Sequence, residues 1–206
     1  MPHMNDPVMP NAPSLETPKG NSRSLILYTV LALGLALVIR FFIAAPYVVS
    51  GASMEPNFHD WNYLIVDRLS YDFGSPQRGD VIIFDLPQDT SRNLIKRVIG
   101  LPGETVMISG NQVEIINAAH PQGFILDEPY LDPADLGGVN ELKVTLPADQ
   151  YFVLGDNRKV SADSRLWGTL PRNDIVGRVF IRLYPFNELG ILPAQSRYVQ
   201  DSTTTK

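Results

Sequence analysis

The chain has 206 residues, of which 44% are hydrophobic, so it can form one domain with a substantial core and an additional segment. Its formal net charge of −5, without any run rich in lysine and arginine, argues against a large nucleic-acid-binding surface. The chain has no cysteine, which excludes disulfides, thiolate nucleophiles and cysteine-based metal sites. Its three histidines, His3, His59 and His120, do not have metal-ligand spacing, so we expect no zinc site.

The N-terminal part of the chain contains a polar stretch followed by a long apolar segment. Residues 1–24 are rich in proline, asparagine and serine and show no periodicity, which predicts a disordered tail. Residues 25–45 read LILYTVLALGLALVIRFFIAA and include one charge, Arg40. At about 1.5 Å per residue, a helix of this length crosses the roughly 30 Å hydrocarbon core of a bilayer. Because apolar residues surround the helix instead of forming a stripe, we expect a transmembrane anchor and not a helix buried in a soluble domain.

A cleavable signal peptide is the alternative interpretation of this apolar segment. The small residues at 44–45 resemble a cleavage site, but Pro46 would directly follow the scissile bond, so we favour an uncleaved anchor. Lys19 and Arg23 precede the span, whereas the first cation after it is Arg68. The positive-inside rule then places the N-terminus in the cytosol and everything after Pro46 on the outer side of the membrane.

The remainder of the chain is predicted to be rich in β-strands. Short runs of β-branched and aromatic residues are separated by glycine, proline, asparagine and aspartate. Gly110-Asn111 predicts a tight hairpin in which both residues supply positive φ angles. Residues 117–141 predict an excursion from the sheet, and the chain from Gln195 onward predicts a loose tail. The expected strands are Tyr63–Asp67, Val81–Asp85, Leu94–Ile99, Thr105–Ser109, Gln112–Ile116, Leu142–Leu146, Tyr151–Leu154 and Val176–Leu183.

Two residues far apart in the sequence are candidates for nucleophilic catalysis. Ser53 lies in the sequence GASMEP at 51–56, where a glycine permits close approach of a substrate backbone; taken alone, such a serine is more typical of a turn. Lys96 shares one face of its predicted strand with Leu94 and Val98. Apolar surroundings lower the pKa of a lysine from about 10.4, so that its amine can accept a proton. The alternative is that Lys96 extends along the rim of the sheet into solvent.

A third segment, GDNRKVSADSRLWG at 155–168, combines charges, hydroxyls and glycines directly after an apolar strand. Its aspartates and arginines can pair, and its serines can orient a neighbouring group through hydrogen bonds. Taken alone, the segment is more typical of a solvated loop with local turns.

Together these segments resemble bacterial signal peptidase I, also called leader peptidase, from the anchor to about Pro185. The blocks that carry the resemblance follow the order of the family: SMEP at 53–56, GDVIIF at 79–84, KRVIGLPGE at 96–104 and GDNRKVSADSR at 155–165. The resemblance implies a membrane-bound serine endopeptidase of the bacterial cell membrane that removes signal peptides from exported preproteins. It also implies a mainly antiparallel β fold with one N-terminal transmembrane helix, a catalytic domain at 46–190 with its core at 47–104 and 148–190, an inserted small β subdomain at 105–147, and a C-terminal tail at 191–206.

The resemblance also assigns roles to individual residues. It implies that Ser53 is the nucleophile, that Lys96 is the general base, and that Ser161 orients the lysine. The backbone N–H of Ser53 would help to bind the oxyanion, and Gly51 takes the place of a serine donor that some family members have. Residues in supporting roles would be Asp163, Arg165 and Arg97.

The expected substrate is an extended signal peptide bound beside an exposed strand. Shallow apolar pockets would select small side chains one and three residues before the cut, with walls formed by Met54, Ile95 and Val49. The mechanism needs no metal or cofactor. The expected partners are preprotein signal peptides and the lipid bilayer, with the protein-export machinery as a further candidate. Phe58 and Trp61 are either membrane-interface residues or core residues.

Rival functions remain open at this point. His59 lies only six positions from Ser53 and would be the base of a Ser/His protease. Self-cleaving repressors of the DNA-damage response also use a Ser/Lys dyad, but they are soluble, so the expected anchor disfavours them. A third possibility is a membrane-tethered β domain that binds peptides without cutting them.

Overall fold

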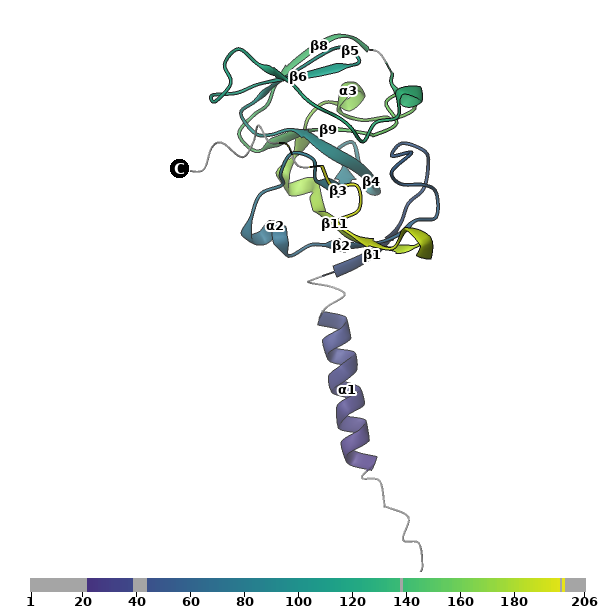
Figure 1. The fold of residues 1–206 in the computed structure, drawn as a ribbon. Helices are drawn as coiled ribbons and strands as arrows, with labels where there is room; N and C mark the ends of the chain where they lie inside the picture. Colours follow the sequence, from purple (N-terminus) through teal and green to yellow (C-terminus); the bar gives the residue numbers. More distant parts are fainter. Residues whose placement is uncertain (1–21, 39–43, 138, 197, 199–206) are drawn as a thin grey trace, which may run out of the picture. The chain divides into compact units, whose positions relative to one another are not determined.

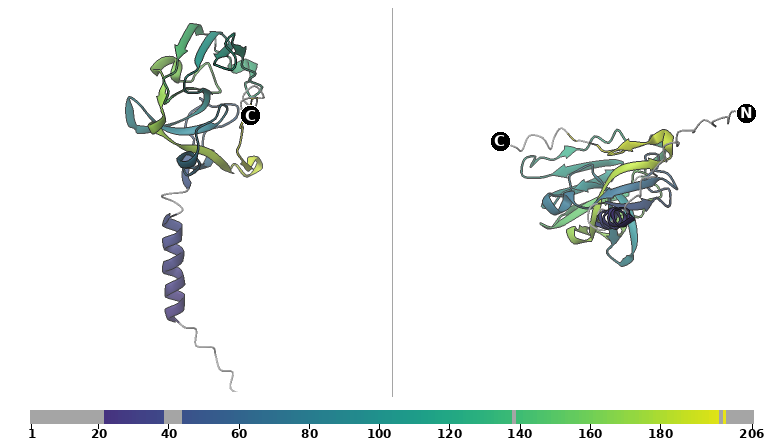
Figure 2. Two further views of the ribbon diagram at one scale, coloured as in Figure 1. Left: turned by 90° about the vertical axis from the view of Figure 1, so that its left-hand side faces the viewer. Right: turned by 90° about the horizontal axis from the view of Figure 1, so that it is seen from below.

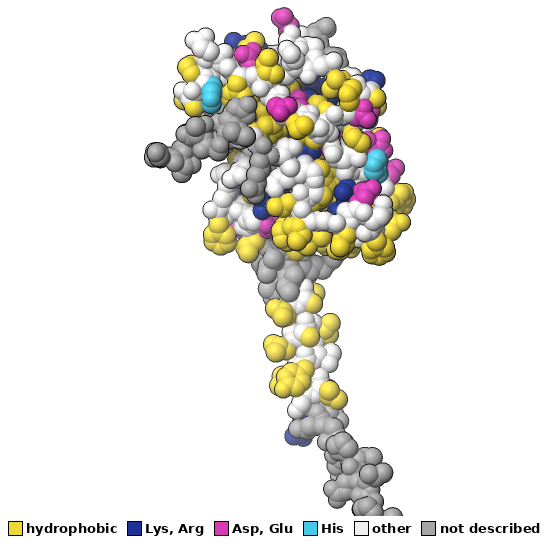
Figure 3. All heavy atoms as spheres, viewed as in Figure 1, with side chains coloured by type: hydrophobic (Ala, Val, Ile, Leu, Met, Phe, Trp, Pro, Cys, Tyr) yellow, Lys and Arg dark blue, Asp and Glu magenta, His cyan; other side chains and the backbone are white. Residues whose placement is uncertain are grey.

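The computed structural model describes residues 22–38, 44–137, 139–196 and 198, in two compact units divided between Leu37 and Val38. Helix α1 (Ser22–Val38) lies in the first unit up to Leu37 (Figure 1). Its large apolar side chains from Leu25 to Leu37 are exposed (Figure 3). Among the described residues, no helix is both long enough and apolar enough to cross a membrane.

Two expected limits near the N-terminus differ from the structure. Helix α1 begins at Ser22, so residues 22–24, assigned above to a disordered tail, are helical. Serine is a favourable residue at the start of a helix. The polar composition of residues 1–24 therefore did not indicate that the helix begins as early as Ser22. The remainder of that tail, 1–21, and part of the expected anchor, 39–43, lie outside the described residues.

The last two residues assigned to the anchor are in a strand. Strand β1 (Ala44–Val48) pairs with β2 (Tyr63–Asp67), and Ala44 lies opposite Asp67 in the register. The expected range of 25–45 for a helix is therefore wrong at its C-terminal end. A short apolar run is compatible with either secondary structure, and here the available edge of β2 decides in favour of a strand.

The second unit contains two antiparallel β-sheets, so the expected mainly antiparallel β fold is confirmed (Figures 1 and 2). The larger sheet has the strand order β1-β2-β11-β3-β4-β9-β10, with β12 paired to β11. Every expected strand is present within a few residues of its predicted limits. The remaining strands of this sheet are β3 (Val81–Leu86), β4 (Asp89–Gly100), β9 (Gln150–Leu154), β10 (Leu170–Pro171), β11 (Ile175–Tyr184) and β12 (Gly190–Ile191).

The smaller sheet has the order β7-β6-β5-β8 and follows β4 in the chain. At the β5–β6 hairpin, Gly110 has a positive φ of 60°, as expected. Asn111 does not have a positive φ, so the expectation for this residue is wrong. The range 117–141, expected to leave the sheet, contains β7 and the start of β8. The strands are β5 (Thr105–Gly110), β6 (Gln112–Ile116), β7 (Phe124–Ile125) and β8 (Val139–Thr145).

The larger sheet is covered on both faces by apolar side chains, which fixes the position of the serine loop. Along β3, Ile83 packs into one core and Ile82 into the other, as expected for alternating side chains. Met54 and Phe58 are fully buried in the same core as Ile83. Phe58 is therefore a core residue, whereas Trp61 is 75% exposed. Burial of Met54 and Phe58 holds the loop between β1 and β2 against the sheet.

Short helices complete the second unit, and the end of the chain is packed against it. Tyr198 is 7% exposed and belongs to a core cluster, so the loose tail expected from Gln195 is wrong for the described residues. The sequence of this end carries no periodic pattern, and its order comes from contacts with distant residues. The helical turns are α2 (Ser70–Phe73), α3 (Ser164–Trp167), η2 (Pro133–Asp135), η3 (Arg172–Asp174) and η4 (Phe186–Glu188).

Candidate active site

Ser53 and Lys96, which are 43 positions apart in the sequence, are in direct contact. The Nζ of Lys96 donates a hydrogen bond to the Oγ of Ser53 at 2.8 Å and another to the carbonyl of Ile95 at 2.9 Å. Lys96 lies on β4 and is 2% exposed, while Ser53 is half-buried in the loop after β1. The structure therefore places a hydroxyl beside a lysine that is almost completely removed from water.

Backbone hydrogen bonds hold the serine loop in place from two sides. Within the loop, the N–H groups of Asn57 and Phe58 both donate to the carbonyl of Met54. From the segment after β9, the N–H of Asn157 donates to the carbonyl of Ser53 at 3.1 Å. The Ser53 backbone is thus tied to the segment after β9, and its side chain is left to interact with Lys96.

Burial gives the lysine its chemical character. It lowers the pKa of Lys96 from 10.5 to about 8, and the positive charge of Arg165 acts in the same direction. The carboxylates of Asp163 and Asp156 act in the opposite direction. With a pKa of about 8, roughly one amine in ten is neutral at pH 7, which is several hundred times more than for an exposed lysine. A neutral amine at hydrogen-bond distance from a hydroxyl can act as a general base.

Ser161, the expected orienting residue, lies beside the Ser53 loop but is not bonded to the lysine. Its Oγ is buried and has no hydrogen-bond partner among the described residues. A Cβ added to Gly155 would lie 2.2 Å from this Oγ and 2.4 Å from the carbonyl oxygen of Ser53. Gly155 therefore permits close packing between Ser161 and the Ser53 loop.

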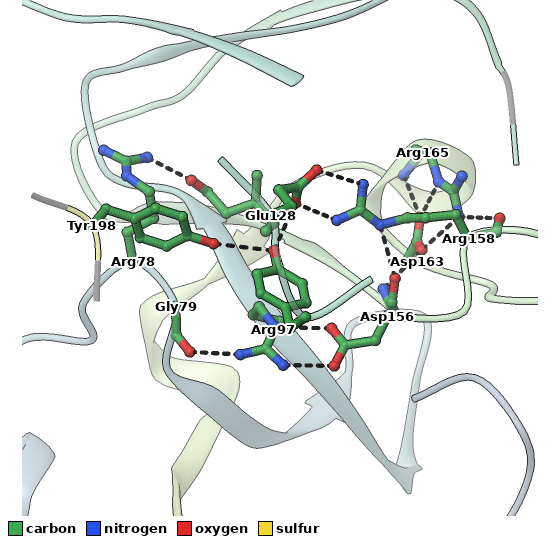
Figure 4. A network of polar contacts seen from close by, with 12 residues as sticks. Arg78, Gly79, Arg97, Glu128, Asp156, Arg158, Asp163, Arg165 and Tyr198 are labelled. Atoms are coloured by element: carbon green, nitrogen blue, oxygen red, sulfur yellow. Dashed lines mark hydrogen bonds and ion pairs between the residues drawn. The ribbon is translucent and has the colours of Figure 1, made fainter. Parts of the chain in front are cut away.

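Asp163 and Arg165, two of the expected supporting residues, pair with each other. The Nε and Nη2 of Arg165 donate to the two carboxylate oxygens of Asp163, each at 2.8 Å (Figure 4). Asp163 also accepts from the N–H of Gly155 at 3.0 Å and caps the start of α3. The carboxylate therefore fixes the loop that carries Ser161, because it bonds to both ends of that loop.

Arg97, the third supporting residue, forms a buried network of its own (Figure 4). Its Nε and Nη2 donate to the carboxylate of Asp156 at 2.8 and 2.6 Å, and its guanidinium lies 3.8 Å from the centre of the Tyr130 ring. Asp156 also accepts from the side-chain amide of Asn57 at 2.9 Å. The pair thus connects β4 to the loop that carries Ser53.

Two cavities flank the serine and lysine, and both are lined by Ser50, Ser53, Leu94 and Lys96. The first has a volume of about 260 Å³ and is bounded by the end of β1 and by β4. The second has a volume of about 410 Å³ and extends toward the β3–β4 turn and α3. A peptide with its scissile carbonyl at Ser53 could therefore place side chains in a cavity on either side of the cut.

The expected pocket walls are only partly in position. Val49 and Ile95 line the smaller cavity, together with Leu64 and Ile83. Met54 lines neither of the two cavities beside the serine. The expectation for Met54 is therefore corrected: its side chain points down into the core and anchors the loop, and it does not reach the substrate side.

Comparison with known proteins gives the family. The model of the family "Signal peptidase, peptidase S26" matches residues 22–184. This chain belongs to the signal peptidase family. The resemblance stated from the sequence is confirmed, and the chain is a hydrolase of the signal peptidase I type, a serine endopeptidase.

Its relatives in the family cover most of the chain. Signal peptidase I of Leptolyngbya laminosa is 40% identical over 203 residues, which is 92% of this chain and 94% of that protein. Probable signal peptidase I-1 of Synechocystis sp. is 38% identical (79% of this chain, 83% of that protein), and signal peptidase IB of Staphylococcus aureus strain COL is 33% identical (79% and 92%). A crystal structure of a signal peptidase I from Enterococcus faecalis V583 is 33% identical, covers 52% of this chain and 97% of that one, and has a TM-score of 0.44.

The side chain of His59, the histidine near the serine, contacts Glu55. The Nδ1 of His59 lies 3.4 Å from a carboxylate oxygen of Glu55, and both side chains are partly exposed. No hydrogen bond joins His59 to Ser53 in the described part of the chain. Within those residues, no group of histidine and acidic side chains has an arrangement that could hold a metal ion.

Three residues of the site network were missed by the sequence reasoning. Asp156 lies in the GDNR block, where the repeated pattern of aspartate and arginine could have indicated a partner for Arg97. Asn57 directly follows the SMEP block and could have been considered with it. Tyr130 lies in a segment without any recognisable pattern, and only its contact with Arg97 reveals its place in the network.

Proposed function

We propose that this enzyme removes signal peptides from exported preproteins, with Ser53 as nucleophile and Lys96 as general base. The observation that carries the proposal is the 2.8 Å hydrogen bond between the Oγ of Ser53 and the Nζ of Lys96, a lysine that is only 2% exposed. The lowered pKa of Lys96 also supports the assignment, because a general base must be partly neutral near pH 7.

In the proposed reaction, the amine of Lys96 takes the proton of Ser53 as the hydroxyl attacks the scissile carbonyl. The tetrahedral oxyanion is stabilised by the backbone N–H of Ser53. The lysine then gives its proton to the departing amine of the mature protein, which leaves the signal peptide as an acyl ester on Ser53. Neutral Lys96 next takes a proton from water as the water oxygen attacks the ester carbonyl. Collapse of the second tetrahedral intermediate breaks the bond to the Ser53 oxygen, which takes the proton back from Lys96, and the signal peptide leaves as a carboxylic acid. Ser161 retains the role of orienting Lys96, which requires its unpartnered hydroxyl to turn toward the amine.

The cavities suggest how the peptide lies across the site. β4 pairs with β3 from Asp89 to Arg97, whereas its pairing with β9 begins at Arg97. The other edge of β4 before Arg97 is therefore open among the described strands, and an extended signal peptide can pair with it. The smaller cavity, with Val49 and Ile95 among its apolar walls, takes the small side chains before the cut. The larger cavity takes the first residues of the mature protein.

Membrane attachment is part of the proposal. The exposed apolar side chains of α1 require an apolar environment, because a helix with this surface is unfavourable in water. We assign this helix to a single-pass anchor with a cytosolic N-terminus and an extracytoplasmic catalytic domain. The bilayer, the signal peptides and the export machinery are the proposed partners.

Cleavage of a purified preprotein by the full chain in detergent tests the proposal directly. We expect a processed band with the parent enzyme and none with Ser53→Ala or Lys96→Ala. His59→Ala and Lys159→Ala, which changes an exposed lysine in the GDNRK segment, serve as matched controls and should retain cleavage. A peptide-binding domain would give no processed band with any variant, and a Ser/His protease would lose activity with His59→Ala.

A second arm of the same assay distinguishes a self-cleaving regulator from an enzyme that cuts preproteins. Incubation of the parent enzyme with an excess of the Ser53→Ala chain should leave that chain intact, whereas the preprotein is cut. Cleavage of the inactive chain with no processing of the preprotein would favour self-cleavage.

A further inference from the structure

The end of the chain forms a strap that lies against the network behind the catalytic lysine. The strap is defined here as Leu192–Ser196 together with Tyr198. It leaves the β11–β12 pair through a hydrogen bond from the N–H of Leu192 to the carbonyl of Phe180 at 2.6 Å. Leu192 and Ala194 have positive φ angles of 47° and 54°, which turn the strap back across the domain. Such angles are unfavourable for residues with a Cβ, so contacts made elsewhere must stabilise this path.

The central contact of the strap is with Arg97. The Nη1 of Arg97 donates to the carbonyl of Ala194 at 2.6 Å and to the carbonyl of Gly79 at 3.1 Å (Figure 4 shows the Gly79 bond). The other two donor nitrogens of the guanidinium bind Asp156. Ala194 thus supplies one of the oxygens that satisfy a fully buried cation, which would otherwise retain an unbonded donor.

Two further contacts hold the strap on either side of Arg97. The side-chain amide of Gln195 donates to a carboxylate oxygen of Asp80 at 3.1 Å. The hydroxyl of Tyr198 donates to the hydroxyl of Tyr130 at 3.1 Å, and the Tyr130 ring lies under the guanidinium of Arg97 (Figure 4). The strap therefore contacts both the guanidinium and the ring that supports it.

The GDVIIF block contains a residue that makes room for the strap. Gly79 has a φ of 89°, and a Cβ at this position would lie 1.9 Å from the carbonyl oxygen of Ser196 and 3.1 Å from the Tyr198 ring. A side chain at 79 is therefore incompatible with the observed path of the strap. The glycine serves the strap as well as the local turn.

We propose that the strap is a positioning element for the catalytic lysine, because it holds Arg97 against Asp156 and closes the back of the site to water. The inference rests on the proposed function of Lys96 as the base. The strap lies beyond residue 184, where the match to the family model ends.

The physical effect of the strap follows from the groups that surround Lys96. Asp163 and Asp156 raise the pKa of the lysine, Arg165 lowers it, and burial lowers it most. When the strap is absent, Arg97 is opened to water and neutralises Asp156 less effectively. The less neutralised carboxylate of Asp156 then raises the pKa of Lys96 toward its ordinary value. The catalytic base is then protonated at neutral pH and recovers only at higher pH.

Two truncations of the full chain test the proposal by their pH–rate profiles. A chain that stops after Tyr198 keeps the strap and should have the parental kcat/KM at every pH. A chain that stops after Ile191 lacks the strap, and the acid limb of its kcat/KM profile should shift to higher pH by about one unit. Its activity at pH 7 should fall roughly tenfold, and the deficit should shrink at pH 10. An unshifted limb, with activity lost equally at all pH values or not lost at all, would overturn the positioning role.

Point variants keep the test valid if the shorter truncation does not fold. Tyr198→Ala removes the ring that covers the network and should shift the acid limb in the same direction, whereas Tyr198→Phe keeps the ring and should restore most of the parental profile. Equal profiles for Tyr198→Ala and the parent would contradict the proposal. Lys96→Ala separates this failure from failure of the proposed function: if that variant still cuts the preprotein, the lysine is not the base and the function itself is wrong.

Discussion

Arg97 and Asp156 form a two-point ion pair in which neither side chain is exposed to solvent. The two residues are 59 positions apart in the sequence, and they connect β4 with the segment that follows β9. Since Lys96 is the neighbour of Arg97 on β4, this pair fixes the strand position from which the lysine reaches Ser53.

Removal of one member of this pair should destabilise the enzyme strongly. Arg97→Met leaves the Asp156 carboxylate buried without its partner, and we expect the free energy of unfolding to fall by about 3–5 kcal/mol. The double variant Arg97→Met/Asp156→Leu should recover part of this loss, because no unpaired charge remains. Urea denaturation measures both, with Lys143→Met on the exposed side of β8 as the control. A single variant as stable as that control would show that the pair contributes little.

The buried lysine should make stability depend on pH. The pKa of Lys96 is about 8 in the folded enzyme and near 10.5 in the unfolded chain, so the unfolded chain binds more protons between these values. The free energy of unfolding should therefore rise with pH between about 8 and 10.5, by about 3 kcal/mol in total. Lys96→Met removes this contribution, and its advantage over the parent should be largest at pH 7 and disappear above pH 10.5. Parallel stability curves for the two proteins would contradict the lowered pKa.

Asp163 and Arg165 should move the activity profile in opposite directions. Asp163→Asn removes a carboxylate that raises the pKa of Lys96 and leaves Arg165 uncompensated, so the acid limb of kcat/KM should shift to lower pH. Arg165→Gln removes a cation that lowers the pKa, so its acid limb should shift to higher pH. The profiles are measured with one preprotein over pH 6–10. Shifts of the same sign in both variants would refute this electrostatic account.

Ser161 should matter for activity more than for stability. Its hydroxyl is buried without a hydrogen-bond partner among the described residues, so Ser161→Ala should change the free energy of unfolding by less than about 1 kcal/mol. If the hydroxyl turns to orient Lys96 during the reaction, kcat should still fall about tenfold or more, with little change in KM. Steady-state kinetics and thermal denaturation of the same preparation separate the two effects. Parental kcat in Ser161→Ala would remove the residue from the mechanism.

The strands and the pair of reacting residues could be predicted from the sequence because their signals are local or belong to contiguous blocks. Runs of β-branched and aromatic residues, bounded by turn formers, predicted the limits of β2 and β6 as the structure has them. Ser53 and Lys96 each lie inside a family block, and the blocks fix their identity, although not the distance between them.

The class of fold, the family and the identity of the two reacting residues were determined by the sequence alone. Each of them depends on residue patterns within contiguous segments of the chain. Only the tertiary structure decided that Met54 is buried, that residues 44–45 pair as a strand, and that Tyr198 packs into the core beside Tyr130. These outcomes depend on contacts between segments far apart in the sequence. The core space that Met54 fills, the strand edge with which residues 44–45 pair, and the partner of a buried charge exist only after the chain has folded. No local sequence pattern predicts them.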